Sequence, residues 1–191
     1  PTNVTCNGAN DGIIRITAPV GGYGTYGYSI DGGLTWQGAG LFSNLPPVTY
    51  DVRIRDAANT ACVIVLNNAL TITEPAVLNA NVNSTNVTCF GANNGTITIT
   101  SPTGGYGTYD YSRNGGTIWQ ASGIFTNLTP GSYNVQIRDR AHTACVIVLN
   151  AALLISEPAV LSATVSSTNV TCFGANNGII TISNPLGGYG T

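Results

Sequence analysis

Hydrophobic and polar positions alternate in short runs along the chain, and turns rich in glycine or asparagine separate these runs. Residues 78–87 (LNANVNSTNV) and 132–139 (SYNVQIRD) alternate as half-buried strands do, and 96–100 (TITIT) is a β-branched strand. Residues 145–156 (CVIVLNAALLIS) form a longer apolar run, which predicts a more buried strand. Since no stretch has helical periodicity, the pattern predicts an all-β protein.

Turn signals between these runs indicate how the strands are connected. Residues 109–119 (YDYSRNGGTIW) are expected to form a hairpin, because Asn114-Gly115 supplies the positive φ angles of a tight turn. Asp31-Gly32 occupies the same place earlier in the chain. Six or seven short strands within about 80 residues are typical of a small β-sandwich.

The whole pattern repeats along the chain with a constant shift. The segment NVTCNGANDG at 3–12 returns as NVTCFGANNG at 86–95 and again at 169–178. Residues 3–85 and 86–168 are identical at 55 of 83 positions, without a gap. The 191 residues therefore amount to two full periods and the start of a third. We expect a piece of a longer polypeptide; the alternative is that neighbouring chains complete the partial domains.

Two Glu-Pro pairs, Glu74-Pro75 and Glu157-Pro158, are the expected domain boundaries. Proline cannot donate a hydrogen bond to a sheet and restricts the residue before it, so each pair is a natural break between sandwiches. The predicted domains are 1–75, a repeat that lacks its first strand; 76–158, a complete repeat; and 159–191, the N-terminal strands of a third repeat.

Two cysteines occur in each period, with the same spacing in both complete copies: Cys6 and Cys62, then Cys89 and Cys145, with Cys172 in the third copy. We expect the bridges Cys6–Cys62 and Cys89–Cys145, with a partner for Cys172 beyond this sequence. The alternative is Cys62–Cys89 with Cys145–Cys172. Disulfides indicate an oxidising, extracellular compartment. Without a histidine cluster or a Cys-x-x-Cys pair, a zinc site is not expected.

Charge is scarce, which excludes several classes of partner. Only 7% of residues are charged, there is no lysine, and the net charge is −2. No basic surface is available for phosphates, so nucleic acid is not an expected partner. No apolar run approaches the ~18 residues of a membrane span.

Few residues that could carry catalysis or bind a metal are retained in both copies; the retained acids are Asp56 with Asp139 and Glu74 with Glu157. His142 is the only histidine, and Asn59 takes its place in the first copy, so we expect no catalytic residue and no cofactor. Glu157 at the predicted joint leaves a Ca²⁺ site conceivable. However, Asp11, Asp31 and Asp51 of the first copy become asparagines in the second, whereas calcium prefers several carboxylate oxygens. The sequence predicts no metal site.

Tyrosines recur at the same positions of both copies and are the candidate glycan contacts. The set is Tyr23, Tyr26, Tyr106 and Tyr109. Alternate tyrosines on a strand can stack on sugar rings, but such side chains also serve as packing. Tyr23 and Tyr106, which glycines flank, are expected to be exposed.

The elements TCFGANNG, TITIT, GGYGTYDYS and LTPGSYNVQIRD, followed by Cys145, resemble the SprB-type repeats of giant cell-surface proteins in gliding and related Bacteroidetes bacteria. The resemblance covers the whole period but departs from the family in the longer insert YGTYDYSRNGGTIWQASG. It implies tandem, secreted Ig-like β-sandwiches with an adhesive or spacer role and no catalytic residue. Tyr50 and Tyr133 then sit where such a sandwich has its tyrosine corner.

Two functions fit these observations. The first is the stalk or fibre of an extracellular adhesin or filament, non-enzymatic, whose partners are neighbouring repeats and, laterally, like filaments. The second is a multivalent carbohydrate-binding module in which many weak sites add up through avidity.

Overall fold

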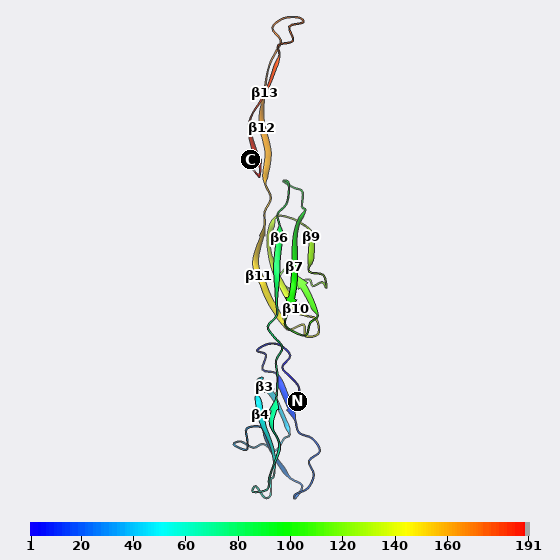
Figure 1. The fold of residues 1–191 in the computed structure, drawn as a ribbon, viewed down its shortest axis with the longest axis vertical. Helices are drawn as coiled ribbons and strands as arrows, with labels where there is room; N and C mark the ends of the chain where they lie inside the picture. Colours follow the sequence, from blue (N-terminus) through cyan, green and yellow to red (C-terminus); the bar gives the residue numbers. More distant parts are fainter. Residues whose placement is uncertain (190–191) are drawn as a thin grey trace. The chain divides into compact units, whose positions relative to one another are not determined.

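The computed structural model describes residues 1–189, and these contain strands and turns but no helix (Figure 1). The strands are β1 (Gly12–Arg15), β2 (Tyr26–Ser29), β3 (Leu41–Leu45), β4 (Thr49–Asp56), β5 (Val63–Thr71), β6 (Asn79–Thr85), β7 (Gly95–Thr103), β8 (Tyr109–Ser112), β9 (Ile124–Leu128), β10 (Gly131–Asp139), β11 (Val146–Ile155), β12 (Ala159–Thr168) and β13 (Ile179–Gly188). The all-β prediction is confirmed. Within this range, no helix has the length and apolar character of a membrane span.

The chain folds as two compact units that do not follow the period of the sequence. Unit 1 consists of Pro1–Asn79, Pro102–Tyr109 and Arg138–Ile147, and unit 2 of Ala80–Ser101, Asp110–Ile137 and the chain from Val148 onward. Unit 1 therefore includes the first repeat (3–85) almost entirely and two segments of the second repeat (86–168). The domain boundaries at Glu-Pro stay a prediction.

The second repeat has the strand order of an Ig-like sandwich. One sheet has the order β6-β7-β9 and the other the order β11-β10-β8. Counted along the repeat, the first, second and fourth strands form one sheet, and the third, fifth and sixth form the other. This is the Ig arrangement without its fourth strand, D. The predicted sandwich fold is therefore confirmed by the topology.

The first repeat has the same order but lacks the first strand of its smaller sheet. Its sheets are β1-β3 and β2-β4-β5. Where β6 pairs with β7 in the second repeat, only a single bridge between Thr2 and Ile13 borders β1. β1 has four residues whereas β7 has nine, so the strand is shorter where its neighbour is missing.

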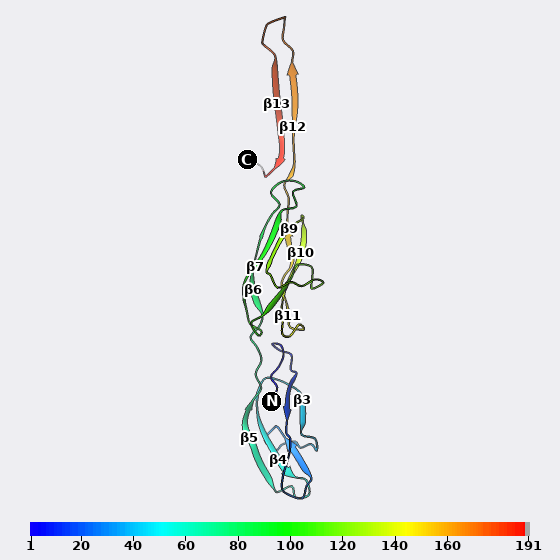
Figure 2. The same cartoon turned by 90° about the vertical axis from the view of Figure 1, so that its right-hand side faces the viewer.

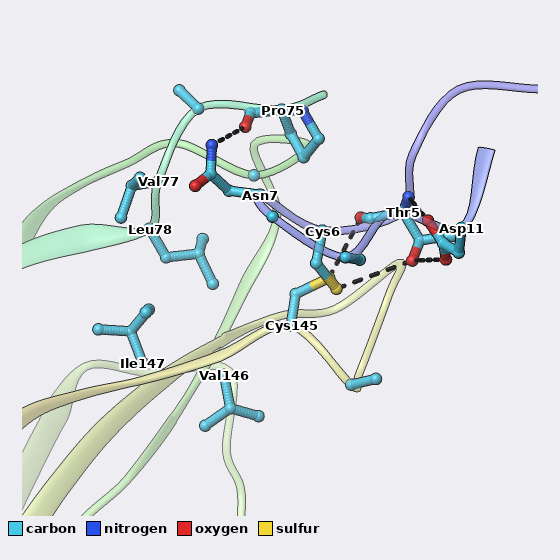
Figure 3. Close-up of a pocket in the computed structure, with 15 residues that line it drawn as sticks. Thr5, Cys6, Asn7, Asp11, Pro75, Val77, Leu78, Cys145, Val146 and Ile147 are labelled. Carbon is cyan, nitrogen blue, oxygen red and sulfur yellow. Dashed lines mark hydrogen bonds between the residues drawn. A yellow bond between two sulfur atoms is a disulfide. The ribbon is translucent and has the colours of Figure 1, made fainter. Parts of the chain in front are cut away.

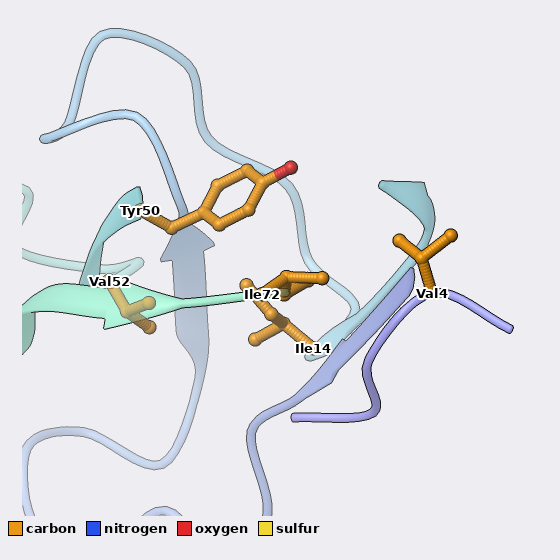
Figure 4. Packing of buried hydrophobic residues seen from close by; sticks show 5 residues of the cluster. All are labelled: Val4, Ile14, Tyr50, Val52 and Ile72. Atoms are coloured by element: carbon orange, nitrogen blue, oxygen red, sulfur yellow. The ribbon is translucent and has the colours of Figure 1, made fainter. Parts of the chain in front are cut away.

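The core of the first repeat forms between its two sheets (Figure 4). Val4, Ile14, Tyr50, Val52 and Ile72 make up this cluster and are each at most 9% exposed. Alternate residues of β4 contribute to it, as the SYNVQIRD-type pattern predicts. The Tyr50 hydroxyl donates to the Pro46 carbonyl at 2.8 Å, which is the hydrogen bond of a tyrosine corner.

The second repeat has the same tyrosine corner, since the Tyr133 hydroxyl donates to the Thr129 carbonyl at 2.8 Å. Both positions were assigned to this device from the sequence, and both are confirmed. The hydrogen bond fixes the turn into the penultimate strand of each repeat, β4 or β10.

The apolar run at 145–156 is not the buried strand that the sequence predicts. β11 is exposed along most of its length, and so is its equivalent β5. Both are edge strands with a single neighbour, β10 or β4. Ile64 in β5 is 64% exposed. Hydrophobicity alone does not distinguish an edge strand from a central one.

The predicted hairpin at 109–119 is a closed turn with a different geometry. The positive φ angles belong to Gly115 and Gly116, at 68° and 86°, and not to Asn114. An isolated bridge between Tyr111 and Gln120 pairs the two sides of the turn. Asn114 acts through its side chain, whose Oδ1 accepts a 3.0 Å hydrogen bond from the Ile118 amide.

The third copy of the repeat contributes an antiparallel pair, β12 and β13 (Figure 2). They form a two-stranded sheet with no further strand, and nearly every residue in them is exposed. The pair corresponds to β6 and β7, one period earlier.

Candidate functional site

A disulfide within unit 1 joins the first repeat to the second. Cys6 and Cys145, 139 residues apart, are bonded with 5.4 Å between their Cα atoms (Figure 3). Cys62, Cys89 and Cys172 are free and exposed. The predicted bridges Cys6–Cys62 and Cys89–Cys145 are therefore wrong, and so is the alternative, Cys62–Cys89 with Cys145–Cys172.

The correction follows from the direction of the strands. Cys62 directly precedes the start of β5, whereas the Cys6 loop is attached beyond its end, because the Gly8 amide donates to Glu74 Oε2 at 2.6 Å. The nine residues of β5 span roughly 30 Å at ~3.3 Å per residue. Cysteines can be bridged only when their Cα atoms lie within about 7 Å, so the two cysteines of one repeat cannot pair.

We call residues 4–11, 74–78, 105–106 and 144–147, which surround this disulfide, the first joint. The Cys6 loop is fixed in it by its own polar side chains. Thr5 donates to Asp11 from its amide at 2.8 Å and from its hydroxyl at 2.5 Å, and the hydroxyl bond is the main cause of a lowered Asp11 pKa. Asn7 Nδ2 donates to the Pro75 carbonyl at 3.1 Å. The loop is therefore held both internally and against the Glu-Pro segment.

Tyr106 of the second repeat contacts the first repeat directly. Its hydroxyl donates to the Val4 carbonyl at 3.1 Å, and its ring lies 4.4 Å from the His142 ring between centroids. Its amide donates to Asp139 Oδ2 at 2.5 Å. These contacts hold the side chain at the joint.

Asp139 caps the turn after β10 and positions Tyr106. It is 0% exposed, and its Oδ1 accepts hydrogen bonds from the Ala141 amide at 2.8 Å and the His142 amide at 3.0 Å. The carboxylate therefore holds the turn closed. In the first repeat, Asp56 accepts hydrogen bonds from the Tyr23, Ala58 and Asn59 amides. The Tyr23 bond is the main cause of a lowered Asp56 pKa.

A pocket of about 460 Å³ lies beside the disulfide (Figure 3). Both cysteines line it, together with apolar side chains that include Val77, Leu78 and Ile147. Cys145 is 8% exposed, so the bond is shielded on one side. The chemistry of this site is that of a covalent cross-link between repeats.

A second joint occurs in unit 2, one period further along the chain. The Tyr189 hydroxyl donates to the Val87 carbonyl, as Tyr106 does to Val4. The Gly91 amide donates to Glu157 Oε2 at 2.8 Å, as Gly8 does to Glu74. Its pocket of about 410 Å³ is lined by Thr88, Cys89, Phe90, Pro158, Ala159, Val160, Leu161, Gly188 and Tyr189.

The candidate glycan tyrosines do not share one environment. Tyr23 is 79% exposed, whereas the Tyr106 hydroxyl is bonded within the joint. The hydroxyls of Tyr26 and Tyr109 donate to the carbonyls of Gly21 and Gly104 at 2.7 and 2.8 Å. Three of the four phenols therefore already have a protein partner, and glycan binding by this set stays a prediction.

The joint glutamates also have protein partners. Glu74 and Glu157 each accept a hydrogen bond from a glycine amide of the loop in their own repeat. No group of three or more His, Cys, Asp or Glu side chains able to hold a metal ion occurs in residues 1–189. Calcium at the joints stays a prediction.

Sequence reasoning did not identify Val4, Tyr106 and the Cys6–Cys145 bond as parts of one site. The available signal was the repeat itself, because Cys145 occupies in the second copy the position that Cys62 occupies in the first. The spacing could not show which of these two cysteines bonds to Cys6.

Comparison with protein families matches the SprB repeat at residues 1–35, 81–117 and 164–191, just over half of the chain. Each matched segment contains the cysteine that comes first in its copy of the repeat, together with the turn that follows it. These cysteines are Cys6, Cys89 and Cys172. No curated protein and no solved structure matches the chain. The chain belongs to the SprB repeat family, a structural repeat family of cell-surface proteins.

Proposed function

We propose that this chain is a non-enzymatic segment of an extracellular stalk or fibre, in which disulfides between consecutive repeats carry tension. The observation that supports this most directly is the bond between Cys6 and Cys145. Both family membership and a structural disulfide fit a protein of the oxidising cell exterior.

The disulfide changes the covalent path along which force travels. When the chain is pulled at its two ends, tension enters at residue 1, crosses from Cys6 to Cys145, and leaves through the residues that follow. The chain between the two cysteines lies outside this path, so most of both repeats cannot be extended while the bond is intact. Such a bypass is useful to a stalk under load.

The remaining features fit a scaffold better than a binding module. The Tyr106 hydroxyl and the joint glutamates are engaged in contacts between neighbouring segments of the chain. Neutral composition, with 7% charged residues, suits close packing of like repeats. Lateral association of such fibres, and their use in surface adhesion, are parts of this proposal.

Single-molecule pulling of the full chain, tethered at its ends, tests the proposal. Oxidised protein should extend less than the Cys145→Ser variant by the length of the bypassed segment. For a separation of 139 residues, this is roughly 480 Å at ~3.3–3.6 Å per residue. Cys62→Ser is the matched control and should extend like the oxidised parent. Equal extension of the parent and Cys145→Ser would contradict the proposal.

A further inference from the structure

We infer that the pocket of the first joint is the entry site for the small thiol that breaks Cys6–Cys145, or the small disulfide that forms it, and that Asp11 makes this site prefer amine-bearing reagents to anionic ones. The inference goes beyond the proposed function, because it gives the joint a reactant and does not depend on the stalk role. Three observations carry it: the pocket reaches the bond, its lining charge is negative, and the second repeat contains a neutral form of the same loop.

The pocket gives a small molecule access to the disulfide from one side (Figure 3). It has a volume of about 460 Å³, and both bonded cysteines line it. Clefts of this size accommodate small organic molecules. Cys145 is 8% exposed, whereas Cys6 is half-buried, so the Cys6 sulfur is the more accessible target for an incoming thiolate. Gly105 also lines the pocket, so the neighbouring Tyr106 holds one of its walls.

The second joint shows that the chain leading into the cysteine loop leaves such a pocket open. Strand β6 leads into that joint, and a pocket of about 410 Å³ is nevertheless present there. Its lining repeats that of the first pocket, with Thr88, Cys89, Pro158 and Leu161 in the places of Thr5, Cys6, Pro75 and Leu78.

The carboxylate of Asp11 lies beside the disulfide, separated from it by one hydroxyl group. The Thr5 hydroxyl donates to Asp11 Oδ2 at 2.5 Å and lies 3.8 Å from Cys6 Sγ. The same hydrogen bond is the main cause of the lowered Asp11 pKa, so this side chain is ionised at neutral pH. Among the residues that line the pocket, all of which the structure describes, no lysine, arginine or histidine occurs. The site should therefore attract an ammonium group and repel a second negative charge.

The second repeat shows that the loop does not need this charge in order to fold. Asn94 takes the place of Asp11, and its Oδ1 accepts a 3.0 Å hydrogen bond from the Thr88 amide, as Asp11 accepts one from Thr5 at 2.8 Å. Asn94 Nδ2 donates to the Thr88 hydroxyl at 2.7 Å, so the contact between the two side chains is also kept. Asp11→Asn should therefore remove the charge and preserve the geometry.

The covalent step is thiol–disulfide exchange. The thiolate of the reagent attacks the Cys6 sulfur, the bond between the two cysteines breaks, and Cys145 leaves as a thiolate. A second reagent thiolate attacks the reagent sulfur of the mixed disulfide, which releases Cys6 and gives the disulfide of the reagent. Two reagent thiols lose two electrons, the protein disulfide gains them, and the two reagent protons end on the cysteines. The reverse sequence, starting from the small disulfide, forms the bond.

Reduction by two small thiols of opposite charge tests the selectivity. Cysteamine carries an ammonium group and mercaptoacetate a carboxylate. The free cysteines of the full chain are alkylated first, and the cysteines released by reduction are then trapped with an isotopically heavy form of the same reagent. Peptide mass spectrometry reports the rate for Cys6 and Cys145 alone. The ratio of the cysteamine rate to the mercaptoacetate rate is compared between variants, so that the intrinsic reactivity of each thiol cancels.

Asp11→Asn should lower this ratio about three- to tenfold relative to the parent. Asp31→Asn is the matched control, because it changes the net charge equally outside the pocket and the second repeat has Asn114 there. It should leave the ratio unchanged. In ~1 M salt, where charges are screened beyond about 3 Å, the parent ratio should fall to that of Asp11→Asn. Assays run at pH 8, where imidazoles carry little charge, so His142, whose attraction lowers the Asp11 pKa, does not mask the effect.

A larger side chain at the pocket tests the route of entry. Val77 lines the first pocket and Val160 the second, and both are 55% exposed. Val77→Trp should slow reduction of Cys6–Cys145 by both thiols several-fold, and Val160→Trp should not change it.

Three results would each overturn the inference: the same ratio in the parent, Asp11→Asn and Asp31→Asn; a ratio that salt does not reduce; or an unchanged rate in Val77→Trp. The alkylation map of the unreduced protein reports the Cys6–Cys145 bond independently. Failure of the selectivity with that bond intact therefore leaves the proposed function standing.

Discussion

The Tyr106 hydroxyl donates a 3.1 Å hydrogen bond to the Val4 carbonyl, and in doing so closes the second repeat onto the backbone of the first. Val4 is fully buried in the core of its own repeat. The bond therefore connects the joint to a rigid part of the first repeat, two residues before the bridged Cys6. The two contacts, one covalent and one not, act on the same short segment.

Tyr106→Phe should weaken the joint without disrupting either core. Loss of one hydrogen bond costs about 0.5–1.5 kcal/mol, which corresponds to a two- to tenfold increase in opening of the joint. The rate at which dithiothreitol reduces Cys6–Cys145 measures this opening. Tyr23 is the equivalent residue of the first repeat and is 79% exposed. Tyr23→Phe should therefore leave the rate of disulfide reduction unchanged. Identical rates for the two variants would show that the Tyr106 bond does not restrain the disulfide.

Acid should loosen one turn of the first repeat and spare its equivalent in the second. Burial by itself would raise the Asp31 pKa, but hydrogen bonds from Thr35 and Ser29 outweigh it and lower the pKa from 3.8 to about 2. A lowered pKa means that the carboxylate stabilises the fold above about pH 4, and that this contribution is lost as the pH falls towards 2. Asn114 makes the equivalent turn and does not titrate.

Amide hydrogen exchange provides a matched measurement of this effect. The Thr35 amide donates to Asp31 at 3.0 Å, and the Ile118 amide donates to Asn114 at 3.0 Å. Between pH 5 and pH 2, the protection factor of the Thr35 amide should fall, and that of Ile118 should stay constant. In Asp31→Asn, both should stay constant. A parallel fall at both amides in the parent would instead indicate general acid unfolding.

Individual strands and turns were predictable from this sequence because each is encoded locally. Alternation in SYNVQIRD placed β10, and the position of Tyr133 after its turn placed the tyrosine corner. The burial of β11 was not predictable, because an edge strand and a central strand can have the same apolar residues. What distinguishes them is the presence of a neighbour, which the run itself does not encode.

The cysteine pairing was beyond local reasoning for a different reason. In a tandem repeat, each residue has an equivalent one period away. A bond predicted within one repeat could therefore equally form with the equivalent residue of the next repeat. Cys62 precedes the start of β5, whereas the Cys6 loop is attached beyond the end of that strand, beside Cys145. Strand directions settle the pairing, and these emerge only from the assembled sandwich.

Core and edge isoleucines should differ sharply in their contribution to stability. Ile137 in β10 is 0% exposed, so Ile137→Ala leaves a cavity and should lower the free energy of unfolding by about 2–5 kcal/mol. Ile64→Ala in β5 removes the same atoms from a side chain that is 64% exposed. This substitution should change the free energy of unfolding by about 0.5 kcal/mol or less. Urea denaturation followed by circular dichroism measures both. A comparable loss in Ile64→Ala would place the edge strand β5 in an apolar contact within the monomer.

Removing the Cys6–Cys145 bond should destabilise the chain while leaving its free thiols in place. By the chain-entropy model, a cross-link that closes a loop of this length restricts the unfolded state by roughly 5 kcal/mol. Cys145→Ser should therefore lower the urea midpoint strongly, and Cys62→Ser, at an exposed free cysteine, should not. A titration of the isolated monomer under denaturing, non-reducing conditions completes the experiment. The parent should show three thiols, Cys145→Ser four and Cys62→Ser two; a single thiol in the parent would mean that a second bridge forms within the chain.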